Sequence, residues 1–193
     1  KNAIGVVTFK SLTFSRRCTM IESNREIKKP SEKREIMPRF EASALRGYCV
    51  SVLTASGVER SCAEAVADAL IDAELTGVST HGVSRLAVYM QRMDAGVMSR
   101  ENNIRIVRES TSTLVVDAGN SLGAAAAKFA MERCIAKAKE TGCCFASVHS
   151  SNHFGTAAYY TRLAAAQDMI GFACTNLKGK IAPFGSAEPY MGT

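Results

Sequence analysis

The chain has 193 residues, of which 47% are hydrophobic and 22% are charged, and its formal net charge at pH 7 is +6. This composition supports a buried core in one ordinary domain, or in one large domain with an appendage, and it excludes a wholly disordered chain. The sequence contains no uninterrupted apolar run of about eighteen residues, so we expect no transmembrane helix and no membrane partner.

The positive charge is concentrated at the beginning of the chain. Residues 1–40 contain ten Lys or Arg and four Asp or Glu, whereas residues 41–193 contain fourteen of each. Most of the chain is therefore electrically balanced and has no excess of basic residues for phosphate backbones. We expect no nucleic acid partner.

Residues 1–39 are predicted to be a leader or linker without regular structure. The first twenty-one residues contain no acidic side chain, which is compatible with an organelle transit peptide, and residues 22–39 alternate in charge and include two prolines. The seven cysteines are odd in number and none has C-x-x-C spacing, which favours a reducing compartment. We expect a cytoplasmic protein, or a mitochondrial matrix protein if residues 1–21 are a transit peptide.

Helical patterns dominate from Phe40 to about residue 95. Residues 41–56 are predicted to form a helix that ends at Gly57. Ser61 followed by Glu64 predicts a capping box at the start of a second helix, for which Gly77 is the stop. A short Ser/Thr/His/Gly loop then precedes a third predicted helix over 83–95.

Strand and helix signals alternate in the remainder of the chain. β-Branched residues predict strands near 103–107 and over 113–116, with a turn at 117–120. An Ala-rich helix is expected over 122–140, then a buried strand over 143–148, a helix over 156–167 and a strand over 169–175. The fold class is therefore α/β or α+β, with a helical domain at the front.

His81, Arg85 and Tyr89 form the first candidate site. If a helix begins at or just after His81, the three side chains stand at i, i+4 and i+8 on one face. A guanidinium holds a carboxylate, an imidazole exchanges a proton near neutral pH, and a phenol orients a polar substrate. This combination matches a 2-oxo or 2-hydroxy acid. The alternative is a capping histidine beside a solvent-facing arginine.

The segment from His149 to Gly155 forms the second candidate site, because ligands favour loops that join the end of a strand to a helix. His149 and His153 have a spacing that can ligate zinc together with Cys143 or Cys144, which would point to a zinc hydrolase. The alternative is a structural loop held by hydrogen bonds of its Asn and His side chains. No G-x-G-x-x-G motif is present, so the sequence has no Rossmann fingerprint.

Four ordered motifs resemble the malate/L-lactate dehydrogenase family of non-Rossmann oxidoreductases, which also includes ureidoglycolate and sulfolactate dehydrogenases. They are Ser-Thr-His-Gly-Val-Ser-Arg at 79–85 followed by Tyr89, Ser-Asn-His-Phe-Gly at 151–155, Met-Ile-Gly-Phe-Ala with a following Thr-Asn at 169–176, and Ala-Pro-Phe-Gly with a following Glu-Pro and Gly-Thr at 182–193. The resemblance runs from about residue 40 to residue 193. It implies hydride transfer between NAD or NADP and a small 2-hydroxy acid of the malate or L-lactate type.

The resemblance also implies roles for individual residues. It implies catalytic roles for His81, His153 and Arg85, and it leaves open which histidine exchanges the substrate proton. Substrate binding is implied for Thr80, Arg85 and Tyr89, and cofactor binding for Asn152, His153, Asn176 and Lys178. No metal is expected.

The implied architecture has a helical domain over 40–116 that carries the substrate-binding His and Arg. Residues 117–193 are then the first part of a non-Rossmann nucleotide-binding domain with a mixed or antiparallel sheet. A homodimer is expected, because in the family a partner subunit helps to close the active site. Members of the family are longer than this chain, so an N-terminal fragment is expected. The alternative is a catalytically incomplete piece or an interaction module of such an enzyme.

Overall fold

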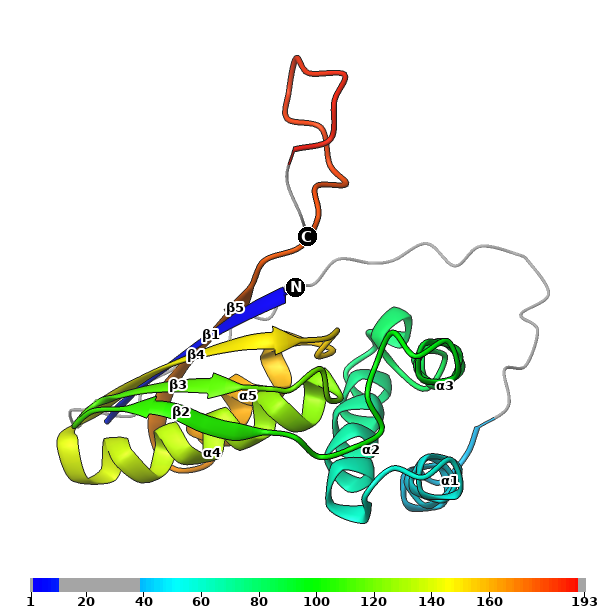
Figure 1. Cartoon of the computed structure of the whole chain (residues 1–193), viewed down its shortest axis with the longest axis horizontal. Helices are drawn as coiled ribbons and strands as arrows, with labels where there is room; N and C mark the ends of the chain where they lie inside the picture. The colour runs from blue at the N-terminus through cyan, green and yellow to red at the C-terminus, as the bar shows by residue number, and fades with distance from the viewer. Residues whose placement is uncertain (1, 11–38, 191–193) are drawn as a thin grey trace, which may run out of the picture.

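The computed structural model describes residues 2–10 and 39–190, and it places them in a mixed α/β fold (Figure 1). Five strands form one sheet in the order β2-β3-β4-β1-β5. Strands β3 and β4 run parallel, and the other neighbouring pairs run antiparallel. The strands are β1 (Asn2–Lys10), β2 (Arg105–Glu109), β3 (Thr113–Asp117), β4 (Cys143–Ser151) and β5 (Met169–Thr175).

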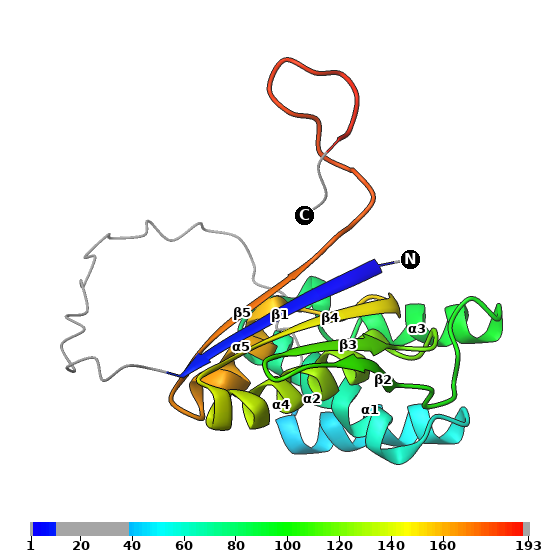
Figure 2. The same ribbon diagram turned by 60° about the vertical axis from the view of Figure 1, so that its left-hand side comes forward.

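The helices are divided between one face of the sheet and one of its ends. They are α1 (Ala42–Ala55), α2 (Arg60–Leu75), α3 (Arg85–Asp94), α4 (Gly123–Thr141) and α5 (Ala157–Ala165), with a short 3₁₀ turn at Ser79–His81. Figures 1 and 2 show α4 and α5 along one face of the sheet and α1, α2 and α3 gathered at one end. The segment 176–190 leaves the sheet after β5 and extends away from it.

One hydrophobic core joins the helical end to the sheet. Fully buried Leu53 and Leu70 from the helical end belong to the same cluster as Val116 and Val148 from the sheet. Helix α4 lies between them and presents small side chains, which let its backbone approach the strands closely. Those side chains are Ala126, Ala127, Ala130 and Ala138, all of them completely buried.

The α/β (α+β) fold class expected from the sequence is confirmed, since the described residues form helices and one mixed sheet. The strand Met169–Thr175 has the predicted bounds, and α4 ends at the predicted stop, Gly142, which adopts a left-handed φ of 86°. Strand β4 is three residues longer than predicted and continues through Ser151. Part of the second candidate site therefore lies on a strand and not in a loop.

Two expectations are wrong. Ser61 does not cap α2: the N-cap is Glu59, and the Ser61 hydroxyl donates a hydrogen bond to the Glu59 carboxylate. Residues 2–10 were expected to belong to a leader or linker, but they form β1, which is hydrogen-bonded between β4 and β5. This segment is rich in apolar and β-branched residues, a composition that favours a strand. Residues 11–38 lie outside the described residues.

The boundary between a helical domain and a nucleotide-binding domain at 116/117 stays a prediction. In residues 2–10 and 39–190, the structure contains no helix that is long and apolar enough to cross a membrane. The six cysteines in these ranges are free thiols, and Cys62 and Cys134 are buried in α2 and α4 as small hydrophobic residues.

Candidate active site

The end of α2 fixes the turn that carries His81. The Glu74 carboxylate accepts a hydrogen bond of 2.8 Å from the Val83 backbone N–H. A Cβ at Gly82 would lie 2.0 Å from Glu74 Oε1, so a larger residue there would displace this carboxylate. His81 therefore ends a 3₁₀ turn, and α3 begins at Arg85. The condition that a helix begins at or just after His81 is therefore not met, although His81 and Arg85 face the same region.

The second histidine is fixed at the start of α4. A Cβ at Gly123 would lie 2.2 Å from the Asn152 carbonyl oxygen and 2.5 Å from that of His153, so glycine is needed for the two segments to pack. The buried Asn152 amide donates hydrogen bonds of 3.0 Å to the Asn120 carbonyl, the Asn120 side chain and the Ser121 carbonyl. These contacts hold His153 at the end of β4 next to the turn that precedes α4.

The tertiary fold brings the two candidate sites together. The imidazole rings of His81 and His153 stack with centroids 5.3 Å apart and an interplanar angle of 27°. The Tyr89 hydroxyl and His153 Nδ1 are 2.8 Å apart, a hydrogen bond whose donor depends on the histidine tautomer. The predicted His81, Tyr89 and His153 thus form one cluster, in which His153 is 64 or more positions from the other two residues.

Burial and nearby positive charge keep the cluster neutral at pH 7. Burial, His81 and two arginines lower the pKa of His153 to about 4. Burial also raises the pKa of Tyr89 to about 12. The pKa of the less buried His81 is lowered by burial and by Arg85. A neutral imidazole next to a protonated phenol is suited to accept a proton in a polar reaction.

A cleft of about 760 Å³ opens beside this cluster. It is bounded by α3, by the turn before α4, by the end of β4 and by the segment that follows β5. The residues that line it are Arg85, Val88, Tyr89, Arg92, Val97, Asp117, Gly119, Asn120, Ser150, Ser151, Asn152, His153 and Leu177. Its size lies in the range of small-molecule and cofactor sites, about 300–1,000 Å³.

Most of the predicted site residues lie at or near this cleft. Arg85, Tyr89, Asn152 and His153 line it. Thr80 lies next to it: its carbonyl accepts a hydrogen bond of 2.6 Å from Arg85 Nε, and its hydroxyl is 3.0 Å from His81 Nδ1. His81 stacks on His153 without lining the cleft.

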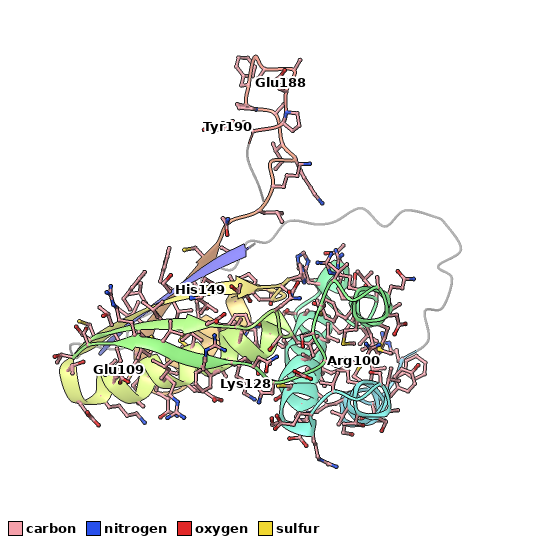
Figure 3. The ribbon with its side chains drawn as sticks, viewed as in Figure 1. Arg100, Glu109, Lys128, His149, Glu188 and Tyr190 are labelled. Atoms are coloured by element: carbon pink, nitrogen blue, oxygen red, sulfur yellow. The ribbon has the colours of Figure 1, made fainter. Side chains whose placement is uncertain are left out.

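Asn176 and Lys178 lie on the exposed segment that follows β5, and only their neighbour Leu177 lines the cleft. Figure 3 shows Glu188 and Tyr190 further along the same segment, well away from the sheet. The structure therefore brings part of the predicted cofactor loop to the edge of the cleft and leaves the rest of it apart.

The zinc alternative does not assemble. His149 Nδ1 lies 3.1 Å from the Ser150 hydroxyl and 3.6 Å from the Asp117 carboxylate. Within the described part of the chain, no three His, Cys, Asp or Glu side chains come close enough together to hold a metal ion. His149 and His153 thus have separate partners in the structure.

Sequence reasoning missed Arg92, Ser151 and Asn120. Arg92 lies three positions after Tyr89, so the i, i+3 spacing on the predicted helix was a signal for it. The Ser151 hydroxyl is buried without a hydrogen-bond partner among the described residues. Asn120 and Ser150, which face the cleft, have φ angles of 61° and 52°. Such strained non-glycine residues are concentrated at functional sites, but no sequence pattern marked these two.

Comparison with known proteins defines the class. A family model described as malate/L-lactate dehydrogenase matches residues 40–193. The chain therefore belongs to the malate/L-lactate dehydrogenase family. It is 40% identical over 144 residues to an L-sulfolactate dehydrogenase of Methanocaldococcus jannaschii, and the aligned region covers 75% of this chain and 42% of that protein. It is 31% identical over 141 residues to a ureidoglycolate dehydrogenase (NAD(+)) of Escherichia coli strain K12, covering 73% of this chain and 40% of that protein.

The fold agrees with the same class. The solved structure of a sulfolactate dehydrogenase from Methanocaldococcus jannaschii superposes with a TM-score of 0.73 at 34% identity, over 79% of this chain and 44% of that one. The chain spans less than half the length of these relatives. The activity of a whole protein of this class is therefore a proposal for this chain.

Proposed function

We propose that the protein is an oxidoreductase that transfers a hydride between NAD or NADP and a small 2-hydroxy acid of the malate or L-lactate type. The observation that carries the proposal is the neutral His153, hydrogen-bonded to Tyr89 and placed beside the guanidinium of Arg85 in one cleft. This is the set of groups that the oxidation of a 2-hydroxy acid requires: a carboxylate holder, a base and an orienting donor.

The cleft fits a dinucleotide cofactor in two respects. It is large enough for more than the small acid, and the buried Ser151 hydroxyl at its wall lacks a hydrogen-bond partner among the described residues. Asn152 and His153 would hold the cofactor on the strand side, and Asn176 and Lys178 would approach it from the segment after β5. When bound, the cofactor accepts or donates the hydride. The name of the Escherichia coli relative supports a nicotinamide cofactor.

Arg85 binds the substrate carboxylate. In the structure its Nε donates to the Thr80 carbonyl, which orients the planar guanidinium and leaves its remaining N–H groups available for a bidentate contact. Thr80 and Tyr89 contribute hydrogen bonds at the same end of the cleft. This arrangement positions the hydroxyl-bearing carbon of the acid next to His153.

His153 accepts the proton of the substrate hydroxyl. When its Nδ1–H donates to the Tyr89 oxygen, Nε2 is free to accept a proton and the Tyr89 hydroxyl is free to donate to the substrate. An anionic substrate opposes the positive charges that lower the pKa of His153, so binding makes the imidazole a stronger base. His81 positions His153 by stacking on its ring.

Steady-state kinetics test the function. The complete gene product that contains this chain is assayed with NADH and NADPH against 2-oxo acids and, in the reverse direction, with NAD and NADP against the 2-hydroxy acids. Turnover with at least one pair is expected. No turnover with any pair would contradict the proposal and would favour the alternative, a catalytically incomplete interaction module.

The resemblance to the family also supports a homodimer whose partner subunit helps to close the cleft. A molar mass of two chains in light scattering would support it, and a monomer that turns over at the same rate at every protein concentration would contradict it.

A further inference from the structure

We propose that Arg92 binds a second anionic group of the substrate, so that the site is built for a 2-hydroxy acid with two acidic groups. This inference rests on the proposed function, because it assigns the far end of a substrate whose first carboxylate is held by Arg85. It divides the two substrate types named above: malate carries a second carboxylate and lactate does not.

Arg85 and Arg92 lie on the same side of the cleft. Both belong to α3, both line the cleft, and Tyr89 lies between them in the sequence. Seven residues of α-helix advance about 10 Å, so the two Cα atoms are two turns apart. Arginine side chains are long enough to approach one small ligand from both ends of such a stretch. The Tyr89–His153 pair then faces the middle of that ligand.

Among the described residues, neither guanidinium has a carboxylate partner. The partner of Arg85 is the Thr80 carbonyl, and the partner of Arg92 is the Asn152 side-chain oxygen, at 3.4 Å. No carboxylate of residues 2–10 or 39–190 lies within ion-pair distance of either arginine.

The cleft has one carboxylate in its lining, that of Asp117, and this group is already paired with Arg105 at 2.5 Å. The cleft therefore presents two unpaired positive charges. A dianion complements them, whereas a monoanion leaves one of them unpaired.

The orientation of Arg92 is built into the fold. Asn152 is buried, and its amide group donates to three acceptors on the turn before α4, so its side-chain oxygen is held toward Arg92. The contact also places Arg92 beside the residue that precedes His153.

The position of Arg92 favours the substrate over a phosphate of the cofactor. Arg92 contacts the side chain of Asn152, the residue next to His153, and it contributes after burial, His81 and Arg85 to the lowered pKa of His153. A phosphate group of a nicotinamide dinucleotide lies further from the reacting ring than the second acidic group of a small 2-hydroxy acid does. The kinetic test separates these two sources of negative charge.

Kinetics with two substrates that differ in one group test the proposal. The complete gene product and its Arg92→Gln variant are assayed for oxidation of L-malate and L-lactate at saturating cofactor. Loss of a charge-assisted contact is expected to lower the malate-to-lactate ratio of kcat/KM by about 10- to 100-fold. Arg92→Lys, which retains the charge without the planar fork, is expected to lie between the two.

Arg108 supplies a matched control, because it is an exposed arginine on β2 outside the cleft. Arg108→Gln removes the same charge and should leave the malate-to-lactate ratio unchanged. An equal loss of kcat/KM for both acids in Arg92→Gln would overturn the proposal in favour of a structural role. A rise in the KM for the cofactor with an unchanged ratio would instead assign Arg92 to a cofactor phosphate.

Equilibrium binding provides a readout that does not depend on turnover. Calorimetric titration of the wild-type protein with L-malate should give tighter binding than titration with L-lactate, and Arg92→Gln should abolish that difference. If no hydride transfer occurs but this pattern is found, the proposed function fails and the dianion site stands. If hydride transfer occurs and wild-type protein binds both acids equally, the function stands and the dianion site fails.

Discussion

Two cavities lined by described residues contain charged side chains, and those charges are paired differently. In the cleft beside His153, Arg85 and Arg92 face open volume without a carboxylate partner among the described residues. The second cavity, of about 430 Å³, lies where α1, α2 and α4 meet. Its cations, Arg46 and Lys128, both bind Asp68, at 2.6 and 3.0 Å.

This difference distinguishes charged groups that stabilise the fold from charged groups that are available to bind a ligand. Burial alone would raise the pKa of Asp68, but the hydrogen bonds from Arg46 and Lys128 outweigh it and hold the pKa below its ordinary value. Asp68 is therefore a stabilising anion that is supplied by the protein itself. In the cleft beside His153, a bound acid would supply the anion that Asp68 supplies in the second cavity. Substitutions in the first cleft should change ligand kinetics, whereas substitutions in the second should change stability.

The largest expected effect is at His153. His153→Ala in the complete gene product should lower kcat by about 100- to 10,000-fold, because it removes the group that accepts the substrate proton. His149→Ala is the matched control, since His149 lies on β4, four residues before His153 and outside the cleft lining, and should retain wild-type turnover. Equal activity of the two variants in steady-state assays would remove His153 from the chemistry.

Arg85 comes next. Arg85→Lys keeps the charge but loses the bidentate contact, so the KM for the 2-hydroxy acid should rise by about 10- to 100-fold while the KM for the cofactor stays nearly constant. Arg46→Lys makes the same change in the second cavity and should leave both KM values as they are. A similar rise in KM for the two variants would show that the cavities do not differ in the way described.

The sequence predicted the helices and most strands because their signals are local. The stop at Gly142 and the strand Met169–Thr175 depend on glycine conformation and on short apolar runs, which are visible in any window of the sequence. Strand β1 depends on pairing with β4 and β5, more than 130 residues away, and its composition was equally compatible with a leader. Pairing partners at that distance leave no local trace.

Residue types and motifs predicted which side chains belong to the site. The contacts between distant residues became visible only in the structure. The spacing of His81, Arg85 and Tyr89 suggested one shared face if a helix began near His81, whereas the contact that joins the two motifs is the hydrogen bond between Tyr89 and His153. Arg92 was missed because an arginine on a helix surface is usually solvated, and only the cleft and the buried Asn152 distinguish it.

The next prediction concerns Asp68 and the free energy of unfolding. Asp68→Asn should lower the free energy of unfolding of the complete gene product by about 1–2 kcal/mol in urea, because two partly exposed cations lose their shared partner. Asp94→Asn breaks an exposed ion pair with Arg100 and should cost less than about 0.5 kcal/mol. Substrate KM should be unaffected in both variants. A rise in substrate KM in Asp68→Asn without a loss of stability would place the second cavity among the ligand sites.

The last effect is the pH dependence that His153 gives to stability. Its pKa is about 4 in the folded protein and 6.5 as its ordinary value, so the unfolded chain binds more protons between these two pH values. The contribution of the neutral imidazole is complete above pH 6.5 and is lost as the pH falls to 4. After allowance for solvent screening, this amounts to about 1–2 kcal/mol.

Urea unfolding at pH 7.5 and pH 4.5 measures this contribution. The loss of stability between the two pH values should be smaller in His153→Gln than in the wild-type protein, because glutamine does not titrate. His149→Gln should lose as much as the wild-type protein, since its imidazole is exposed on β4. An identical pH dependence in all three proteins would mean that His153 is solvated like an ordinary surface histidine, and the contrast between the two cavities would then rest on the arginines alone.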